Sequence, residues 1–323
     1  MKDTKNWEFN TRLYSISTNS SVKSLESTIG VFVNTKMFGE KGLTDLEQTV
    51  LSGNWTLSKM QEYSRHWTDD AVANTDGAAT NVYGLGISQK NMVDAFYHAA
   101  GFKGIDTNEL GMPEHVFLKE SVLNEIDPFF TALVTLCDSS EVYINPSFQP
   151  EDGMAPLQNG TAAMFVAEMG RIGLVSGSKD HIFIPMPKLL PSQEYRTVFN
   201  WSHDVWSVPI HSENPEIGGL IIELLASTDY LSIAPLWYGY NLAGRYSTDD
   251  VGGQIFNLVR QSSTAEFARL YVTAGTPYSI LRNALVNSRS EIVLANNVKY
   301  ELSQANTSLR ISLNNFKNAM PYQ

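Results

Sequence analysis

Short runs of β-branched residues alternate with longer helical stretches along the chain, and this alternation constrains the fold more than any other feature. The segment TIGVFVN at 28–34 predicts a buried strand, and HIFIPMP at 181–187 predicts another. Between them, Thr56 is suited to cap a helix whose Leu57 and Met60 share one face. Alternation of this kind predicts an α/β architecture.

A strand followed by a helix is also predicted after residue 200. The segment DVWSVPI at 204–210 alternates polar and apolar residues, and the Asn-Pro pair at 214–215 supplies a cap and a first-turn proline. Successive side chains of a strand point to opposite faces, which separates His203 from Asp204 and places Trp201 on the same face as His203. His203 and Asp204 therefore do not form a catalytic dyad by themselves.

The last third of the chain is predicted to be helical. Ser247 and Asp250 have capping-box spacing, and apolar residues recur at three- and four-residue intervals over 290–320. We interpret this final segment as one long amphipathic helix docked along the globular body, in preference to a coiled coil.

Length, charge and cysteine content limit the class of protein. At 323 residues, two lobes with a cleft between them are expected. The net charge of -11 leaves no basic surplus for a phosphate backbone, so no nucleic-acid partner is expected. The single cysteine, Cys137, excludes an internal disulfide, and its apolar surroundings indicate a buried thiol. The first residues lack the apolar core of a signal peptide, and no uncharged window reaches membrane-spanning length.

The sequence patterns of common catalytic and metal sites are missing or incomplete. No G-x-S-x-G elbow occurs, YGLGIS lacks the third glycine of a dinucleotide-binding loop, and the 6 histidines include no HExxH pair. No catalytic residue, metal ion or cofactor is therefore expected. An enzyme that hydrolyses glycosides with two carboxylates in the cleft remains an alternative. The two acids of such an enzyme can be far apart in the sequence, so no local motif would identify them.

Aromatic residues gather in two segments. FNWSHDVWSVPI contains Trp201 and Trp206, and LWYGYN contains Trp237, Tyr238 and Tyr240. Flat rings beside hydrogen-bonding side chains suit a sugar, which has an apolar C–H face and a rim of hydroxyl groups. Burial of the same rings in the hydrophobic core is the alternative.

Six motifs follow one another in a characteristic order. They are GVFVNTKMFGEKGL, LSGNWTLSKMQEYSRHW, LQNGTAAMFVAEMGRI, IFIPMPK, VPIHSENPEIGGLIIELLAS and APLWYGYNLAGRYSTDDVGGQIFNLVR. Over nearly its whole length the chain thereby resembles the extracellular solute-binding proteins of ABC importers (family 1), in the clostridial-type branch related to maltose-binding protein. The resemblance implies a two-lobe, type II periplasmic-binding-protein fold that closes on its ligand by a hinge motion.

The resemblance also implies a domain organisation. Residues 1–26 and 200–240 would form the first lobe with the crossover strands, and residues 27–199 and 241–323 the second lobe with the carboxyl-terminal helices. A further segment, LYSISTNSS at 13–21, precedes the six motifs and also resembles this family. Members of the family carry a secretion signal and further strands and helices ahead of this segment. The first lobe is therefore expected to be incomplete.

By resemblance, the protein would capture a carbohydrate, an oligosaccharide in our interpretation, and deliver it to a membrane permease. It would act as a monomer without chemistry of its own. The complete protein would be extracellular or in the cell envelope, as a membrane-anchored lipoprotein, although this chain has no signal peptide. The alternatives are a glycoside-active enzyme and a truncated, non-functional fragment of a binding protein.

The expected ligand-binding residues follow from the implied cleft. Rings that would stack on a sugar are Trp201, Trp237, Tyr238 and Tyr240. Side chains that would hydrogen-bond hydroxyl groups are Asn19, Glu168, Arg171, Asn200 and Asp204. For Glu168 and Arg171, a mutual ion pair is the alternative.

One loop resembles a calcium loop of relatives in this branch. It keeps Asp76 and Gly77 but has alanines at 78–79, where further oxygen ligands would be needed. No calcium is expected there.

Overall fold

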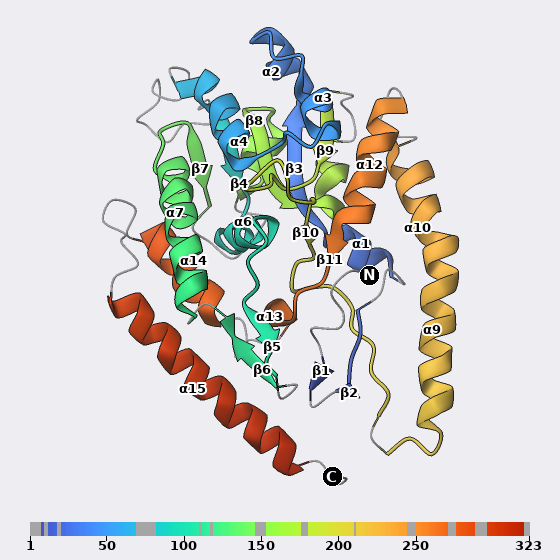
Figure 1. The fold of residues 1–323 in the computed structure, drawn as a ribbon. Helices are drawn as coiled ribbons and strands as arrows, with labels where there is room; N and C mark the ends of the chain where they lie inside the picture. Colours follow the sequence, from blue (N-terminus) through green and yellow to red (C-terminus); the bar gives the residue numbers. More distant parts are fainter. Residues whose placement is uncertain are drawn as a thin grey trace.

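A five-stranded sheet lies at the centre of the computed structural model (Figure 1), with strand order β7-β4-β8-β3-β9. Its strands are β3 (Ile29–Asn34), β4 (Tyr83–Ile87), β7 (Val142–Ile144), β8 (Ala162–Glu168) and β9 (His181–Ile184). The structure describes residues 8–9, 12–17, 21–68, 82–109, 112–116, 119–145, 153–175, 180–209, 211–243, 250–270, 276–287 and 296–319. Strands β3 and β9 confirm the two strands predicted at 28–34 and 181–187.

Strand direction places one set of strand ends together. β4 runs parallel to β7 and β8, with Ile87 opposite Ile144 and Val166, whereas β3 runs antiparallel to β8, with Ile29 opposite Glu168. The carboxyl ends of β4, β7 and β8 and the start of β3 therefore meet at one border of the sheet, which we call the carboxyl edge. Ligands of open α/β sheets bind at such an edge.

Helices cover both faces of the sheet, so β3 is buried along its whole length. The helical segments around the sheet are α2 (Thr35–Glu40), α3 (Leu46–Leu51), α4 (Leu57–Ser64), η2 (Arg65–Trp67), η3 (Lys90–Val93), α6 (Asp94–Ala99), α7 (Glu120–Cys137), α8 (Ala155–Gln158), η6 (Met169–Val175) and α12 (Asp250–Ser262). Thr56 caps α4 as predicted, because its hydroxyl accepts a hydrogen bond from the Lys59 N–H at 3.3 Å. Cys137 is buried, which confirms the prediction of an enclosed thiol.

Two segments far apart in the sequence run side by side at the carboxyl edge. The first contains α1 (Val22–Glu26), and the second follows β10 (Thr197–Val198), which pairs with β11 (Ser263–Thr264). Isolated bridges join Thr28 to Phe199 and Ile16 to Trp206. The resemblance implies crossover strands near residues 20–34 and 195–207. We use the name first crossover for the described residues of 14–28 and second crossover for residues 199–209.

The predicted strand at 204–210 is wrong for the residues of it that the structure describes, 204–209, because only Trp206 makes a bridge there and the bridge is isolated. Residues 201–203, directly before it, form a turn. The turn is held by His203, whose backbone N–H donates to the Asn200 carbonyl at 3.2 Å and whose Nδ1 lies 2.6 Å from the same oxygen. Trp201 is 56% exposed and His203 is 5% exposed, so the two side chains do not share a face. Two local hydrogen bonds override the alternating pattern.

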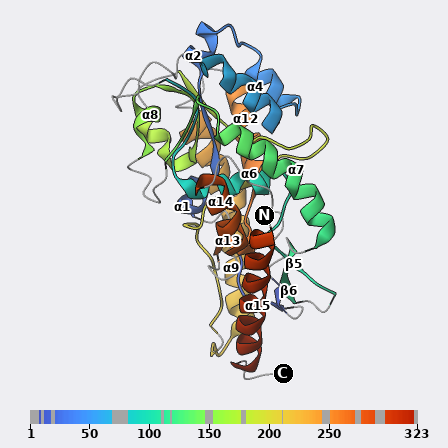
Figure 2. The same cartoon turned by 90° about the vertical axis from the view of Figure 1, so that its left-hand side faces the viewer.

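Two long helices extend away from the sheet (Figures 1 and 2). α9 (Pro215–Leu231) begins at its proline as predicted, and α15 (Asn296–Ala319) forms the described part of the helix predicted at 290–320. Leu302 and Leu309 of α15 are buried in the main core, which confirms the docked interpretation. The remaining elements are α10 (Ile233–Pro235), η7 (Leu236–Ala243), α13 (Phe267–Leu270), α14 (Thr276–Asn287), β1 (Glu8–Phe9), β2 (Arg12–Leu13), β5 (Ile105–Thr107) and β6 (Pro113–His115). Ser247 and the loop with Asp76 and Gly77, where no calcium is expected, lie outside the described residues.

Candidate functional site

The carboxyl edge brings together four of the predicted ligand-binding residues, namely Glu168, Arg171, Asn200 and Trp201. Asn200 Nδ2 donates a hydrogen bond to Glu168 Oε1 at 2.6 Å, and Ser202 Oγ lies 3.3 Å from the same oxygen. Arg171 Nε lies 3.8 Å from Glu168 Oε2. The ion pair that the sequence left open for Glu168 and Arg171 is therefore present, and it sits beside the second crossover.

Asn200 is held in one orientation. It is 2% exposed, and its Oδ1 accepts hydrogen bonds from the Trp201 N–H at 2.9 Å and from Arg269 Nη2 at 2.8 Å. Arg269 Nη1 in turn lies 3.4 Å from Asp94 Oδ2. Because both donors approach Oδ1, the amide nitrogen faces Glu168, and the Glu168 carboxylate is fixed in space.

Trp201 presents its ring to solvent directly beside this network. Its side chain is 56% exposed, while its backbone is anchored to the buried Asn200. An exposed indole next to hydrogen-bonding groups suits a sugar ring, which has an apolar C–H face and a rim of hydroxyl groups. Beneath the turn, burial lowers the pKa of His203, whose ring packs on Phe199 with 5.6 Å between centroids. His203 therefore has a structural position.

A second carboxylate belongs to the same edge. Glu26 ends α1, and burial together with the negative charge of Glu168 raises the pKa of Glu26. Gly170 allows this approach, because a Cβ there would lie 3.0 Å from the Glu26 Cβ. The edge thus carries two neighbouring acidic side chains.

Sequence reasoning missed the polar residues that follow β4 and β7. Ser88 N–H donates to the Val166 carbonyl at 3.0 Å, and Asn145 Nδ2 donates to the Ser88 carbonyl at 2.9 Å. Ser88 Oγ and Asn91 Oδ1 are buried and have no hydrogen-bond partner among the described residues. The available signal is a polar residue directly after each strand, Ser88 after β4 and Asn145 after β7.

The other predicted binding residues lie apart from this network or outside the described residues. Asp204 is half-buried in the second crossover, and its backbone N–H donates a hydrogen bond to Ser24 Oγ at 3.0 Å. Tyr238 is 3% exposed and lies in the core, and Trp237 packs against the same cluster, as the core alternative for these rings states. Tyr240 is 75% exposed. Asn19 is not among the described residues.

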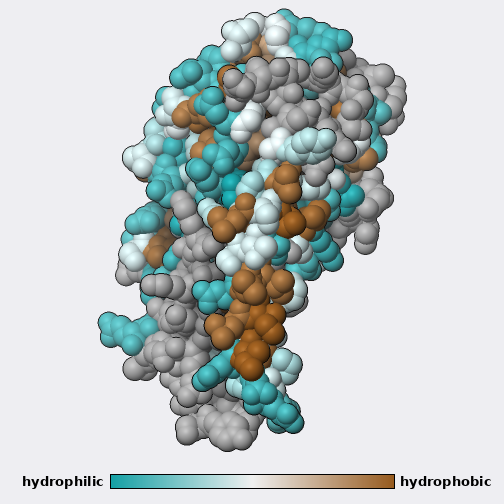
Figure 3. All heavy atoms as spheres, turned by 90° about the vertical axis from the view of Figure 1, so that its right-hand side faces the viewer, coloured by the Kyte–Doolittle hydropathy of each residue, from teal (hydrophilic) through white to brown (hydrophobic). Residues whose placement is uncertain are grey.

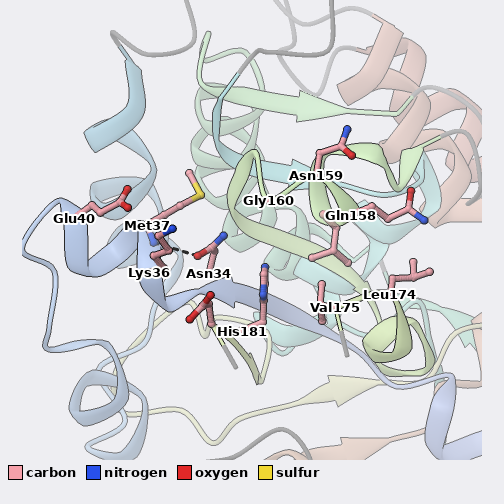
Figure 4. Close-up of a pocket in the computed structure, with 12 residues that line it drawn as sticks. Asn34, Lys36, Met37, Glu40, Gln158, Asn159, Gly160, Leu174, Val175 and His181 are labelled. Atoms are coloured by element: carbon pink, nitrogen blue, oxygen red, sulfur yellow. Dashed lines mark hydrogen bonds between the residues drawn. The ribbon is translucent and has the colours of Figure 1, made fainter. Parts of the chain in front are cut away.

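A cavity of about 470 Å³ lies at the opposite border of the sheet (Figure 4). Asn34 at the end of β3 and His181 at the start of β9 line it, together with residues of α2 and α8. The predicted binding residues do not line this cavity. Among the described residues, no group of three or more His, Cys, Asp or Glu side chains is placed to hold a metal ion.

Comparison with known proteins identifies the fold. No family model and no curated protein matches the chain. Solved structures do match it, with TM-scores of 0.51 to 0.56 and 12 to 14% sequence identity. The matches cover 94 to 96% of this chain and 71 to 76% of the solved chains.

Three of these structures illustrate the group. One is a Streptococcus pneumoniae solute-binding protein in complex with the blood group A-trisaccharide, at 14% identity, 96% coverage of this chain, 74% of that chain and a TM-score of 0.54. The binding protein of a Bifidobacterium longum ABC transporter, in complex with lacto-N-biose, has 13% identity, 94% and 71% coverage and a TM-score of 0.56. The third, the ABC transporter associated binding protein of B. animalis subsp. lactis in complex with β-1,6-galactobiose, has 13% identity, 95% and 75% coverage and a TM-score of 0.56. The chain has the type II periplasmic-binding-protein fold of the sugar-binding proteins of ABC transporters.

Proposed function

We propose that this protein is the substrate-binding component of an ABC importer and that it captures a carbohydrate at the carboxyl edge. The observation that carries the proposal is the fixed Asn200–Glu168 pair beside the exposed ring of Trp201. Glu168, Arg171 and Ser202 supply acceptors and donors for hydroxyl groups, and Trp201 supplies the stacking surface. The solved structures of this fold contain oligosaccharides, which supports the same ligand class.

The paired crossovers support a hinge. Asn200 N–H donates to the Ser27 carbonyl at 2.8 Å, and Ser17 Oγ donates to the Asp204 carbonyl at 3.1 Å, so the two crossovers would bend together. A ligand that touches both sides of this joint would favour one arrangement. We propose residues 1–26 and 200–240 as parts of the first lobe and residues 27–199 and 241–323 as the second.

In this role the protein would act outside the cytoplasmic membrane and deliver its ligand to a membrane permease. A monomer is sufficient for this role. Ligand-observed NMR of the 323-residue chain with β-1,6-galactobiose, lacto-N-biose and maltotriose tests the carbohydrate assignment, because the method detects even millimolar binding. Saturation transfer to at least one sugar is expected. Transfer to a peptide or amino acid, and to none of the sugars, would show that the ligand class is wrong.

Catalysis is the second candidate, because Glu26 and Glu168 form a neighbouring carboxylate pair in which the pKa of Glu26 is raised. Glycoside hydrolysis needs one protonated acid and one carboxylate on either side of the scissile bond. Here Glu168 Oε1 already accepts a hydrogen bond from Asn200 Nδ2, which favours a role in ligand binding over a role in catalysis. Incubation with nitrophenyl glycosides separates the two functions, since release of nitrophenol that Glu168→Gln abolishes would establish an enzyme.

A further inference from the structure

The cavity opposite the carboxyl edge is not used by the proposed function. Its volume of about 470 Å³ lies within the range of small-molecule sites. β3 runs from one border of the sheet to the other, so Ile29 lies at the carboxyl edge and Asn34 lines the cavity. α2, α8 and η6 contribute its other walls (Figure 4). A molecule in this cavity would therefore be separate from a ligand at the carboxyl edge.

The polar part of the cavity is a cross-strand pair. Asn34 of β3 lies opposite His181 of β9 in the antiparallel register, so the two side chains lie next to each other on one face of the sheet (Figure 4). His181 is 8% exposed, and its Nδ1 and Nε2 atoms are buried without a hydrogen-bond partner among the described residues. Buried polar groups normally have a partner, because their desolvation is otherwise not compensated. A molecule in the cavity can supply the partner that His181 lacks.

His181 and Asn34 offer both kinds of hydrogen-bonding group. Burial lowers the pKa of His181, so its neutral ring has one donor and one acceptor nitrogen. Asn34 Oδ1 accepts a hydrogen bond from the Met37 N–H at 3.1 Å and thereby caps α2. Asn34 Nδ2 points toward the turn at Gly160, where an added Cβ would lie 3.6 Å from it. The amide nitrogen is therefore directed at the opposite wall of the cavity.

The remaining lining limits the chemistry of the ligand. Leu157 and Val175 are 1% and 6% exposed and form an apolar part of the wall. Lys36, Glu40 and Asp180 are exposed at the rim, and their one positive and two negative charges give an anion no net attraction. The lining contributed by the described residues contains no aromatic ring, so recognition would depend on hydrogen bonds and aliphatic contacts. A neutral molecule with hydroxyl groups and an apolar side matches this lining.

We propose that this cavity is an accessory binding site for a neutral polyhydroxylated molecule of monosaccharide size. One hydroxyl group would donate a hydrogen bond to the unprotonated ring nitrogen of His181, and another would accept one from Asn34 Nδ2. The C–H side of the molecule would lie against Leu157 and Val175. The proposal does not depend on the ligand assigned to the carboxyl edge.

The exposed apolar side chains of α9 are a separate feature that the test must keep apart from the cavity. Leu220 and Leu224 are each 66% exposed, and Figure 3 shows an apolar patch over this helix. Within the described residues, the stretch Pro215–Tyr240 is long and apolar enough to cross a membrane by length and composition, although Ala234 and Tyr238 in it are buried in the core. An exposed apolar patch can adsorb apolar molecules without selectivity. The probes are therefore hydrophilic, and binding is read at His181.

NMR of the 323-residue chain labelled with nitrogen-15 in its 6 histidines tests the proposal. The signals of the His181 ring nitrogens are those that disappear in a His181→Gln variant. D-glucose and myo-inositol are the neutral probes, and inorganic phosphate and putrescine are the charged probes. A saturable shift of the His181 signals is expected with at least one neutral probe, and no shift with either charged probe. The Trp201→Ala variant should give the same shift, because the cavity is separate from the carboxyl edge.

A matched pair of variants tests the part of Asn34. Asn34→Asp keeps the oxygen that caps α2 but replaces the amide donor, so it should weaken binding of the neutral probe by about tenfold. Asn54→Asp makes the same chemical change at an exposed position outside the cavity and should leave binding unchanged. Circular dichroism of both variants shows whether they are folded like the wild type.

Four results would overturn the proposal. They are the absence of a His181 shift with both neutral probes, a shift with a charged probe alone, unchanged affinity in a folded Asn34→Asp variant, and loss of the shift in Trp201→Ala. The last result would place the probe at the carboxyl edge and would support the proposed function. Failure of the proposed function has a different signature, namely a His181 shift that persists when no sugar binds in a Trp201-dependent way.

Discussion

Asn200 Nδ2 lies 2.6 Å from Glu168 Oε1, and this hydrogen bond ties the second crossover to the carboxyl end of β8. The same Asn200 side chain receives Arg269 Nη2 at 2.8 Å, so Arg269 connects it to the buried Asp94 carboxylate. A buried amide that joins three segments positions the groups around Trp201. The candidate site therefore depends on residues that do not themselves face solvent.

Asn200→Ala should destabilise the protein by roughly 2–4 kcal/mol, because it leaves hydrogen-bonding groups of Glu168 and Arg269 without their partner in a buried setting. Urea denaturation followed by circular dichroism measures this loss. The control is Asn159→Ala at an exposed turn, where a change below about 0.5 kcal/mol is expected. Equal effects at the two positions would show that the Asn200 network adds no stability.

Gly153→Ala should disturb the carboxyl edge. A Cβ at this position would lie 2.2 Å from the Ser88 carbonyl oxygen and 2.5 Å from Asn145 Nδ2, so backbone must move. A loss of about 1–3 kcal/mol is expected from this overpacking. Gly173→Ala is the matched control, because nothing lies within 4 Å of its added Cβ. A Gly153→Ala variant as stable as the control would contradict the close approach of these segments.

The stability of the protein should depend on pH through Glu266. Burial raises the pKa of Glu266 from 4.5 to about 7, and its Oε1 accepts a hydrogen bond from the Gly104 N–H at 3.1 Å. Between these two pH values the folded state binds more protons than the unfolded state. The contribution of Glu266 is therefore fully present below pH 4.5 and is lost as the pH rises through about 7.

Glu266→Gln removes this titration and keeps an acceptor oxygen for Gly104. The stability of the variant relative to the wild type should rise by about 2.5 kcal/mol between pH 5 and pH 8. Urea denaturation at intervals across this range gives the difference. Glu301→Gln on the exposed side of α15 is the control. A difference that stays constant with pH would rule out a raised pKa for the Glu266 carboxyl group.

Local patterns predicted the regular elements well. β3 and α4 depend on a short apolar run and on the Thr56 cap, which are contained in neighbouring residues. The turn at 201–203 was not predictable in this way, because its alternating pattern is overridden by hydrogen bonds from His203 to the Asn200 carbonyl. The fold as a whole followed from the order of motifs along the chain.

The candidate site was predictable in part. Glu168 and Asn200 were predicted from the cleft that the family resemblance implies. Ser88 and Asn145 could be found only from the strand order β7-β4-β8, which brings them to one edge. The aromatic residues could not be sorted by sequence, since Tyr238 and Tyr240 are two positions apart yet are 3% and 75% exposed. Their exposure depends on how η7 packs against the second core cluster, a tertiary property.

Trp201→Ala tests the central claim most directly. In this variant, the saturation-transfer NMR signal of the sugar that the wild-type chain binds should fall at least tenfold, because the stacking surface is removed. The variant should still fold, since a side chain that is 56% exposed adds little stability. Tyr300→Ala, which removes a ring 66% exposed on α15, should leave the signal unchanged. Full sugar binding by a folded Trp201→Ala variant would contradict the assignment of the ligand to the carboxyl edge.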